Sequence, residues 1–115
     1  MLTFHPEGDL ASVRGAGAAK ATLCISSSAS LKIEDIAKAA TGPVWFQIYV
    51  QRDRGFTREL VQRAEAAGCR ALCVTVDSPT FGVRNREDRA RAELPPRELP
   101  NLKGKDYRFV RRICG

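Results

Sequence analysis

The chain has 115 residues, of which 43% are hydrophobic and 28% are charged, as in an ordinary soluble globular domain. It contains no apolar run near the roughly 20 residues of a transmembrane helix, and its N-terminal residues lack the basic and apolar regions of a secretory signal. We therefore predict a single cytoplasmic domain without a membrane span.

Positive charge is concentrated toward the C-terminus. The net charge is +6, and residues 82–115 hold ten of the 19 basic residues but only five of the 13 acidic ones. Clusters of this kind can bind nucleic-acid phosphates, so one alternative is a non-catalytic basic binding or scaffold module that contacts nucleic acid through residues 82–115. Because no nucleic-acid motif accompanies the charges, we favour a solvated, mobile tail.

Helices and strands are predicted to alternate along the first 77 residues. The first helix covers about residues 6–19, where Pro6 suits the first turn and small apolar residues follow at helical spacing. Its small side chains are predicted to permit close packing. A short strand over 22–26 leads to a second helix with Ser30 as its expected N-cap. The turn at 41–43, Thr-Gly-Pro, ends that helix.

The same order repeats in the rest of this region. A strand over 44–50 precedes a third helix, which ends at Gly68 as its C′ residue, and a last strand covers 71–77. The inward residues of the third helix are predicted to be Phe56, Leu60, Val61, Ala64 and Ala67.

The spacing of the strand ends predicts the sheet. Ser26, Tyr49 and Thr75 follow one another at steps of 23 and 26 residues, the length of one strand plus one helix with short loops. We therefore predict successive βα units in a parallel sheet.

Each predicted strand has one aliphatic face and one face of small or polar residues. On 44–50, Phe46 and Ile48 alternate with Gln47 and Tyr49. A doubly wound sheet usually has continuous apolar strands, whereas in a barrel the aliphatic face meets the helices and the other face points to the lumen. The predicted fold class is therefore α/β: a partial TIM (β/α)8 barrel of about three parallel βα units followed by a long loop.

Polar residues near the strand ends form the candidate site, because the carboxyl ends of barrel strands carry active sites. They are Ser26, Gln47, Tyr49 and Thr75. Buried amide and phenol groups cost free energy unless they are hydrogen-bonded, so Gln47 and Tyr49 point to a site about as strongly as to a core. Ser26 and Thr75, taken alone, are more simply explained as structural residues facing the lumen.

The cysteines and the histidine do not predict a metal site. No CxxC pair occurs among the four cysteines, and the sole histidine, His5, is far from them in the sequence. Cys24 and Cys73 lie in apolar strand-like runs, where a thiol usually acts as a small buried hydrophobe. We expect His5 to have a structural role at the start of the first helix.

A set of ordered stretches covers most of residues 5–102 and resembles a known family. The stretches are His-Pro-Glu-Gly-Asp-Leu-Ala at 5–11, Leu-Cys-Ile-Ser-Ser at 23–27, Gly-Pro-Val-Trp-Phe-Gln-Ile-Tyr-Val at 42–50, Arg-Ala-Glu-Ala-Ala-Gly-Cys-Arg-Ala-Leu at 63–72, Thr-Val-Asp-Ser-Pro at 75–79, and Gly82 to Asn85 with Leu-Pro-Pro at 94–96. In order and spacing they resemble the FMN-dependent α-hydroxy-acid dehydrogenase and oxidase family, which includes glycolate oxidase and flavin-linked lactate dehydrogenase.

The resemblance implies a role for each candidate residue. Ser26, Gln47 and Thr75 match residues that contact the flavin of FMN, whose reduced form carries negative charge near N1 and O2 and is stabilised by hydrogen-bond donors. Tyr49 matches the tyrosine whose hydroxyl contacts the substrate's hydroxyl or developing carbonyl oxygen. Arg84 matches an arginine of the substrate-binding set, where a guanidinium can pair with a carboxylate.

The implied activity is FMN-dependent oxidation of a small L-2-hydroxy acid, such as glycolate or lactate, to the 2-oxo acid. The family's catalytic histidine and arginine and its flavin-stabilising lysine have no counterpart here, so no catalytic residue is predicted in this chain and we expect it to be inactive alone. Full-length relatives are expected to form homo-oligomers.

The predicted domain covers 1–102, with an active-site loop from about 78, and 103–115 form a basic tail whose disorder is left open. Three strands leave two open sheet edges, so we interpret the chain as a fragment: a truncated gene, a partial gene model or a split subunit.

Overall fold

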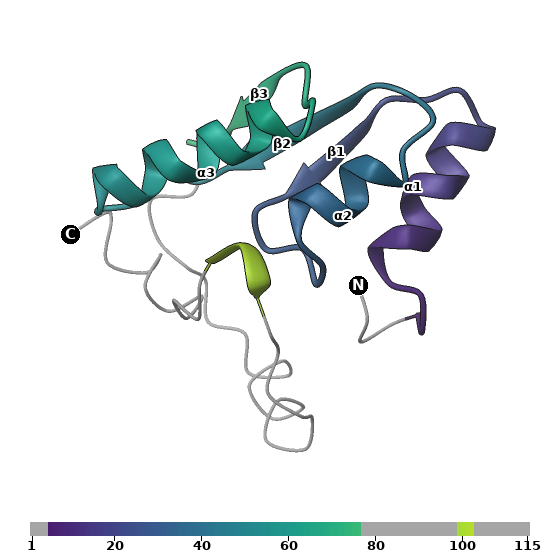
Figure 1. Ribbon diagram of the computed structural model, residues 1–115, viewed down its shortest axis with the longest axis horizontal. Helices are drawn as coiled ribbons and strands as arrows, with labels where there is room; N and C mark the ends of the chain where they lie inside the picture. The colour runs from purple at the N-terminus through teal and green to yellow at the C-terminus, as the bar shows by residue number, and fades with distance from the viewer. Residues whose placement is uncertain (1–4, 77–98, 103–115) are drawn as a thin grey trace.

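The computed structural model describes residues 5–76 and 99–102 (Figure 1). Their elements are α1 (Asp9–Ala18), β1 (Leu23–Ser26), α2 (Ile33–Lys38), β2 (Val44–Ile48), α3 (Arg54–Ala66), β3 (Leu72–Val74) and the 3-10 helix η1 (Pro100–Leu102). The predicted order of helices and strands is confirmed. Most of the predicted loop from about 78, with Arg84, and the tail at 103–115 lie outside the described residues.

The three strands form one parallel sheet in the order β1-β2-β3. Ser26 on β1 is in register with Gln47 on β2, and Gln47 is in register with Cys73 on β3. Successive strands are therefore neighbours, as the 23- and 26-residue spacing predicted. All three strands end at the same edge of the sheet, so the polar residues that follow them lie together.

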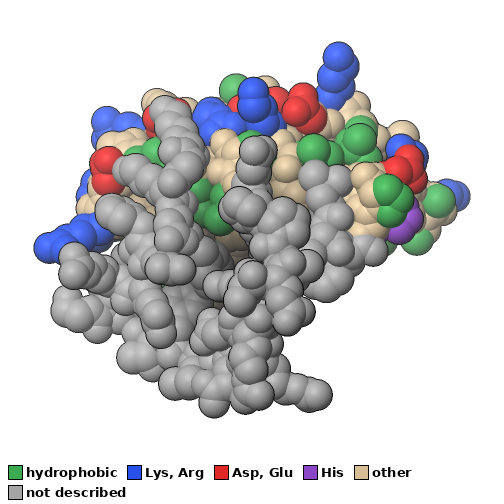
Figure 2. All heavy atoms as spheres, turned by 90° about the horizontal axis from the view of Figure 1, so that it is seen from below, with side chains coloured by type: hydrophobic (Ala, Val, Ile, Leu, Met, Phe, Trp, Pro, Cys, Tyr) green, Lys and Arg blue, Asp and Glu red, His purple; other side chains and the backbone are tan. Residues whose placement is uncertain are grey.

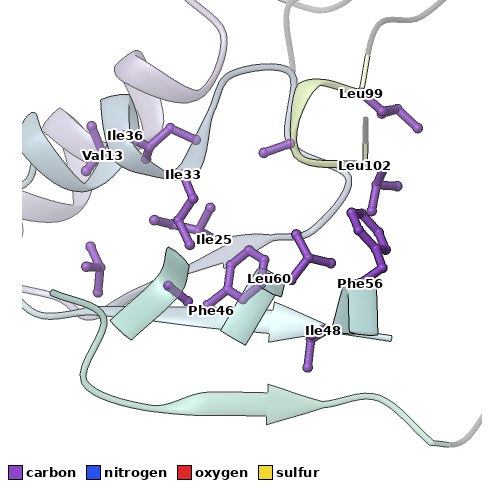
Figure 3. Packing of buried hydrophobic residues seen from close by; sticks show 13 residues of the cluster. Val13, Ile25, Ile33, Ile36, Phe46, Ile48, Phe56, Leu60, Leu99 and Leu102 are labelled. Carbon is purple, nitrogen blue, oxygen red and sulfur yellow. The ribbon is translucent and has the colours of Figure 1, made fainter. Parts of the chain in front are cut away.

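The helices cover one face of this sheet, and the hydrophobic core lies between the helices and the sheet (Figure 3). Ile25, Phe46 and Ile48 point from the strands into this core. The remaining members are Val13, Ala29, Ile33, Ile36, Val44, Phe56, Leu60, Ala64, Leu99 and Leu102. The predicted aliphatic faces of β1 and β2 are thus confirmed as the faces that meet the helices, as in the wall of a barrel.

The opposite face of the sheet is open among the described residues. Cys24 is exposed and so is Trp45, its partner across the strand pair. The prediction that Cys24 is buried was therefore wrong, because its side chain lies on the face that no described element covers. Cys73 is half-buried.

Several helix and strand ends differ from the predictions. Ser30 is not the N-cap of α2, since Lys32 occupies that position and the Ser30 amide instead donates to Asp9 Oδ2 at 2.9 Å. β3 ends at Val74 rather than at 77, and β2 ends at Ile48 rather than at 50. Beyond these residues the chain continues as loops, although the Thr75 amide still donates to the Ile48 carbonyl at 3.1 Å.

The end of α3 and the packing of α1 were predicted correctly. Gly68 has φ 87°, the left-handed conformation that suits a C′ glycine. Gly17 on α1 faces Thr41, and a Cβ at this glycine would collide with the threonine hydroxyl. Close packing at this point therefore depends on a small residue, as the small side chains of α1 predicted.

The outer face of β3 lacks a described covering element. Leu72 is 42% exposed and Val76 is 85% exposed, although both continue the aliphatic pattern that is buried on β1 and β2.

Within residues 5–76 and 99–102, no helix has the length and apolar character needed to cross a membrane.

A matched pair of leucine truncations tests this arrangement of the core. Leu60 on α3 is 1% exposed, so Leu60→Ala should lower the free energy of unfolding by about 2 to 5 kcal/mol, whereas Leu72→Ala should lower it by less than about 1 kcal/mol. Urea denaturation followed by circular dichroism measures both. Equal losses would contradict a core that buries Leu60 and leaves Leu72 uncovered.

Candidate functional site

The side-chain amide of Gln47 joins the ends of all three strands. Its Nε2 donates to Thr75 Oγ1, just after β3, at 2.8 Å. On its other side, Oε1 lies 3.4 Å from both the Ser26 hydroxyl and the Ser27 hydroxyl, and the same distance from the Ser27 amide. The structure therefore brings together three predicted site residues, Ser26, Gln47 and Thr75, at the carboxyl edge of the sheet.

The orientation of this amide follows from its partners. The Ser27 backbone N–H can only donate, so the Gln47 atom that faces it must be the oxygen. The NH2 group then faces Thr75, whose hydroxyl oxygen accepts. Among the described residues, one Nε2 hydrogen and the Thr75 hydroxyl hydrogen remain available, so this edge can present two further donors to a ligand.

Ser27 belongs to the site, but it was not among the predicted site residues. It is almost fully buried, whereas Ser26 is exposed. The Ser27 amide also donates to the Gln47 backbone carbonyl at 3.0 Å, which extends the pairing of β1 with β2 by one residue. Three consecutive serines follow Ile25, so the sequence alone did not show which of them would face Gln47.

Tyr49 follows directly after β2, and its loop is held by local hydrogen bonds. The Gln51 side chain donates to the Tyr49 carbonyl at 2.9 Å, and the Gln51 amide donates to Thr57 Oγ1 at 3.0 Å. Asp53 caps α3 by accepting from the Phe56 amide at 3.0 Å. The half-buried Tyr49 therefore starts a well-connected loop at the same edge as Gln47.

The thiols of Cys24 and Cys69 are poor nucleophiles. Partial desolvation raises the pKa of Cys24 from 9.0 to about 11, and a side-chain hydrogen bond and charge interaction with Cys73 add to the shift. Burial also raises the pKa of Cys69. Because the reactive form of cysteine is the thiolate, these groups are protonated at neutral pH and do not resemble catalytic cysteines.

Metal ligands and charged side chains are the other polar features of the described region. No group of three or more metal-ligating side chains occurs within 5–76 and 99–102. Basic and acidic side chains are interspersed on the face of the described region shown in Figure 2. The basic segment proposed for nucleic acid, 82–115, lies almost wholly outside the described residues, so that alternative stays a prediction.

Comparison with known proteins identifies the family. The family model for FMN-dependent dehydrogenases matches residues 2–109. The chain belongs to this family. Relatives include glycolate oxidase 3 of Oryza sativa subsp. indica, 45% identical over 92 residues, and L-lactate oxidase of Nostoc sp., 43% identical over 96 residues. Each of these alignments covers 80% of the chain.

Solved structures agree with this assignment. Mandelate oxidase with (S)-2-phenylpropionate is similar over 82% of the chain, with a TM-score of 0.74 and 44% identity. A structure of an oxidised active mutant of (S)-mandelate dehydrogenase is similar over 91% of the chain, with a TM-score of 0.79 and 33% identity. The predicted fold class, a partial TIM (β/α)8 barrel, is confirmed.

This FMN-dependent dehydrogenase family member spans only part of its relatives. It covers 25% of the rice glycolate oxidase and 26% of the Nostoc lactate oxidase, and 28% and 30% of the two mandelate-enzyme structures. The predicted family of oxidoreductases and its predicted cofactor, FMN, are both confirmed at the level of the family.

The raised pKa of Cys24 predicts slow alkylation. At about pH 7.5 the folded chain should hold roughly a hundredfold less Cys24 thiolate than a thiol of pKa 9.0. Iodoacetamide should therefore modify Cys24 far more slowly in the folded chain than in urea, as measured by peptide mass spectrometry. The rate should rise with pH up to about 11, and Cys73→Ala should increase it at neutral pH. Equal rates with and without urea would contradict the shift.

Proposed function

We propose that this chain forms one wall of the FMN and substrate site of an enzyme that oxidises a small L-2-hydroxy acid to the 2-oxo acid. The observation that carries the proposal is the row Ser26, Gln47 and Thr75, joined by the Gln47 amide at the carboxyl edge of the sheet. The names of the relatives, which refer to glycolate, lactate and mandelate, support the same class of substrate.

The donor set of this row fits the polar edge of a flavin. FMN, when bound, supplies the acceptor for the hydride that leaves the hydroxy acid. Gln47 would donate through its remaining amide hydrogen and Thr75 through its hydroxyl, because each uses its other hydrogen-bonding capacity on its neighbour. Ser26 would contact the cofactor from β1. Neutral donors of this kind favour the negative charge of the reduced state.

Tyr49 and Arg84 are proposed to bind the substrate. Tyr49 lies two residues after Gln47 and starts the loop held by Gln51, so its hydroxyl would meet the substrate's hydroxyl oxygen beside the flavin. Arg84, which lies outside the described residues, would pair with the carboxylate through its two parallel N–H groups. Its role rests on the sequence resemblance.

The proton chemistry would come from outside this chain. The sole histidine, His5, lies before α1, where its Nδ1 accepts from the Glu7 amide at 3.2 Å, so it acts in the local turn. We therefore propose that residues 1–102 are a partial barrel domain, inactive alone and completed by further polypeptide. A cytoplasmic location and a homo-oligomeric full-length protein stay predictions.

A pair of glutamine substitutions tests FMN binding. Titration of FMN with the 115-residue chain, followed by flavin fluorescence and visible absorbance, should reveal binding that Gln47→Leu weakens by about tenfold or more, since a half-buried donor to the polar edge of the flavin is lost. Gln62→Leu, on the exposed face of α3, is the matched control and should leave the affinity unchanged. Equal affinities of both variants would argue against the Gln47 contact.

A chimera tests the substrate role. Residues 2–109 replace the corresponding quarter of the rice glycolate oxidase, and Tyr49→Phe in that chimera should lower kcat/KM for glycolate by about 10- to 100-fold. The reason is the loss of a hydroxyl that contacts the substrate in the transition state. An active chimera whose kcat/KM does not change with Tyr49→Phe would contradict this role, and an active isolated chain would contradict the proposal that it is inactive alone.

A further inference from the structure

Asn101 lies far from the site in the sequence, yet it is bound to the loop that forms one side of it. Its side chain is 0% exposed. Its Oδ1 accepts from the Ile33 amide at 2.9 Å, and its Nδ2 donates to the Leu31 carbonyl at 2.9 Å. One side chain thus satisfies a backbone donor and a backbone acceptor 68 and 70 residues away.

This contact replaces a cap that α2 does not supply for itself. Lys32 occupies the N-cap position and makes no side-chain cap hydrogen bond, so the first helical amide, that of Ile33, depends on Asn101. Buried backbone groups without partners are costly. The start of α2 is therefore fixed by a residue of η1 rather than by its own sequence.

Further contacts hold Asn101 itself in place. Arg63 on α3 donates to Asn101 Oδ1 at 3.2 Å and to Glu34 at 2.7 Å and 2.9 Å. Leu99 and Leu102, on either side, are buried in the core. The side chain of Asn101 is thus held between α2 and α3 by both polar and apolar contacts.

The loop that Asn101 holds leads directly to Gln47. This β1–α2 loop covers residues 27–32. At its other end, the amide and hydroxyl of Ser27 contact Gln47 Oε1, and in between the Ser30 amide donates to Asp9. The loop has only six residues, so a short path of backbone connects Leu31 and Ile33 to the Ser27 groups that face the Gln47 amide.

We propose that Asn101 is a positioning residue for the candidate site: it fixes the β1–α2 loop and through Ser27 sets the orientation of the Gln47 amide. Its effect on the cofactor rests on the proposed function, since Gln47 is the proposed FMN contact. Its effect on the geometry of the Gln47 amide does not.

The test compares the 115-residue chain with Asn101→Leu, Asn101→Asp and a control, Val44→Ala. Leucine removes both hydrogen-bonding groups of Asn101, whereas aspartate keeps an oxygen for the Ile33 amide beside Arg63. Val44 is buried at the amino end of β2, away from the loop, so its truncation lowers stability without touching the contact. If the leucine variant does not fold, Asn101→Ser takes its place, because serine is too short to keep both the Ile33 and the Leu31 hydrogen bonds and the same results are expected of it.

The first readout needs no ligand. Asn101→Leu should speed hydrogen exchange of the Ser27 and Ile33 amides by about tenfold or more and shift the nuclear magnetic resonance signal of the Gln47 side-chain amide. Asn101→Asp should keep Ile33 protected and the Gln47 signal near its wild-type position. Val44→Ala should lower Tm and leave the Gln47 signal in place. The decisive case is a folded Asn101→Leu or Asn101→Asp variant in which the Ile33 amide has lost protection from exchange. If the Gln47 signal does not move in such a variant, the proposal is overturned.

The second readout separates this inference from the proposed function. FMN titration should show affinity about tenfold lower for Asn101→Leu and close to wild type for Val44→Ala at a temperature where both are folded. If the wild-type chain binds FMN and Asn101→Leu binds it equally well, the positioning role is wrong. If the wild-type chain binds no FMN, the proposed function loses its support, and the exchange and Gln47 signals still decide the role of Asn101.

Discussion

The amide of Gln47 is the interaction on which the candidate site depends. It lies on the central strand, and its amide accepts from one neighbouring strand end through Oε1 while it donates to the other through Nε2. Ser27 determines which way the amide faces, and Thr75 accepts from its nitrogen. A hydrophobic residue here would leave Ser26, Ser27 and Thr75 as separate hydroxyls. With Gln47, the strand ends form one connected polar edge.

The one-sided burial of the sheet explains why this edge is available. Helices α1, α2 and α3 all contribute to a single core on the aliphatic face, so the other face, with Cys24 and Trp45, has no described cover. In a closed barrel this second face is filled by side chains from strands across the lumen. The chain covers about a quarter to a third of its relatives, which is consistent with the open lumen face and the uncovered Leu72 and Val76.

Long-range contacts compensate for weak local signals around the site. The helix α2 has six residues and no side-chain cap of its own, a combination that is marginal in isolation. Asn101 and the Arg63 to Glu34 ion pair hold it from α3 and η1. The pairing lowers the pKa of the Glu34 carboxyl and raises the pKa of Arg63, chiefly through their hydrogen bond. Glu34 therefore supports the fold above its ordinary pKa and loses this contribution as pH falls through its lowered value.

The order of elements, the parallel sheet and the family could be predicted from the sequence, because periodicity, glycine and proline turns, and the spacing of Ser26, Tyr49 and Thr75 are all local or regular signals. The sequence also predicted that Ser26, Gln47 and Thr75 lie together at the strand ends, but it did not predict Ser27. The folded chain was needed to show that Ser27 contacts Gln47, that Ser30 does not cap α2, that Cys24 is exposed, and that Asn101 binds the first amide of α2. These features depend on which groups meet across strands or across 68 residues of chain, and no local pattern encodes such meetings.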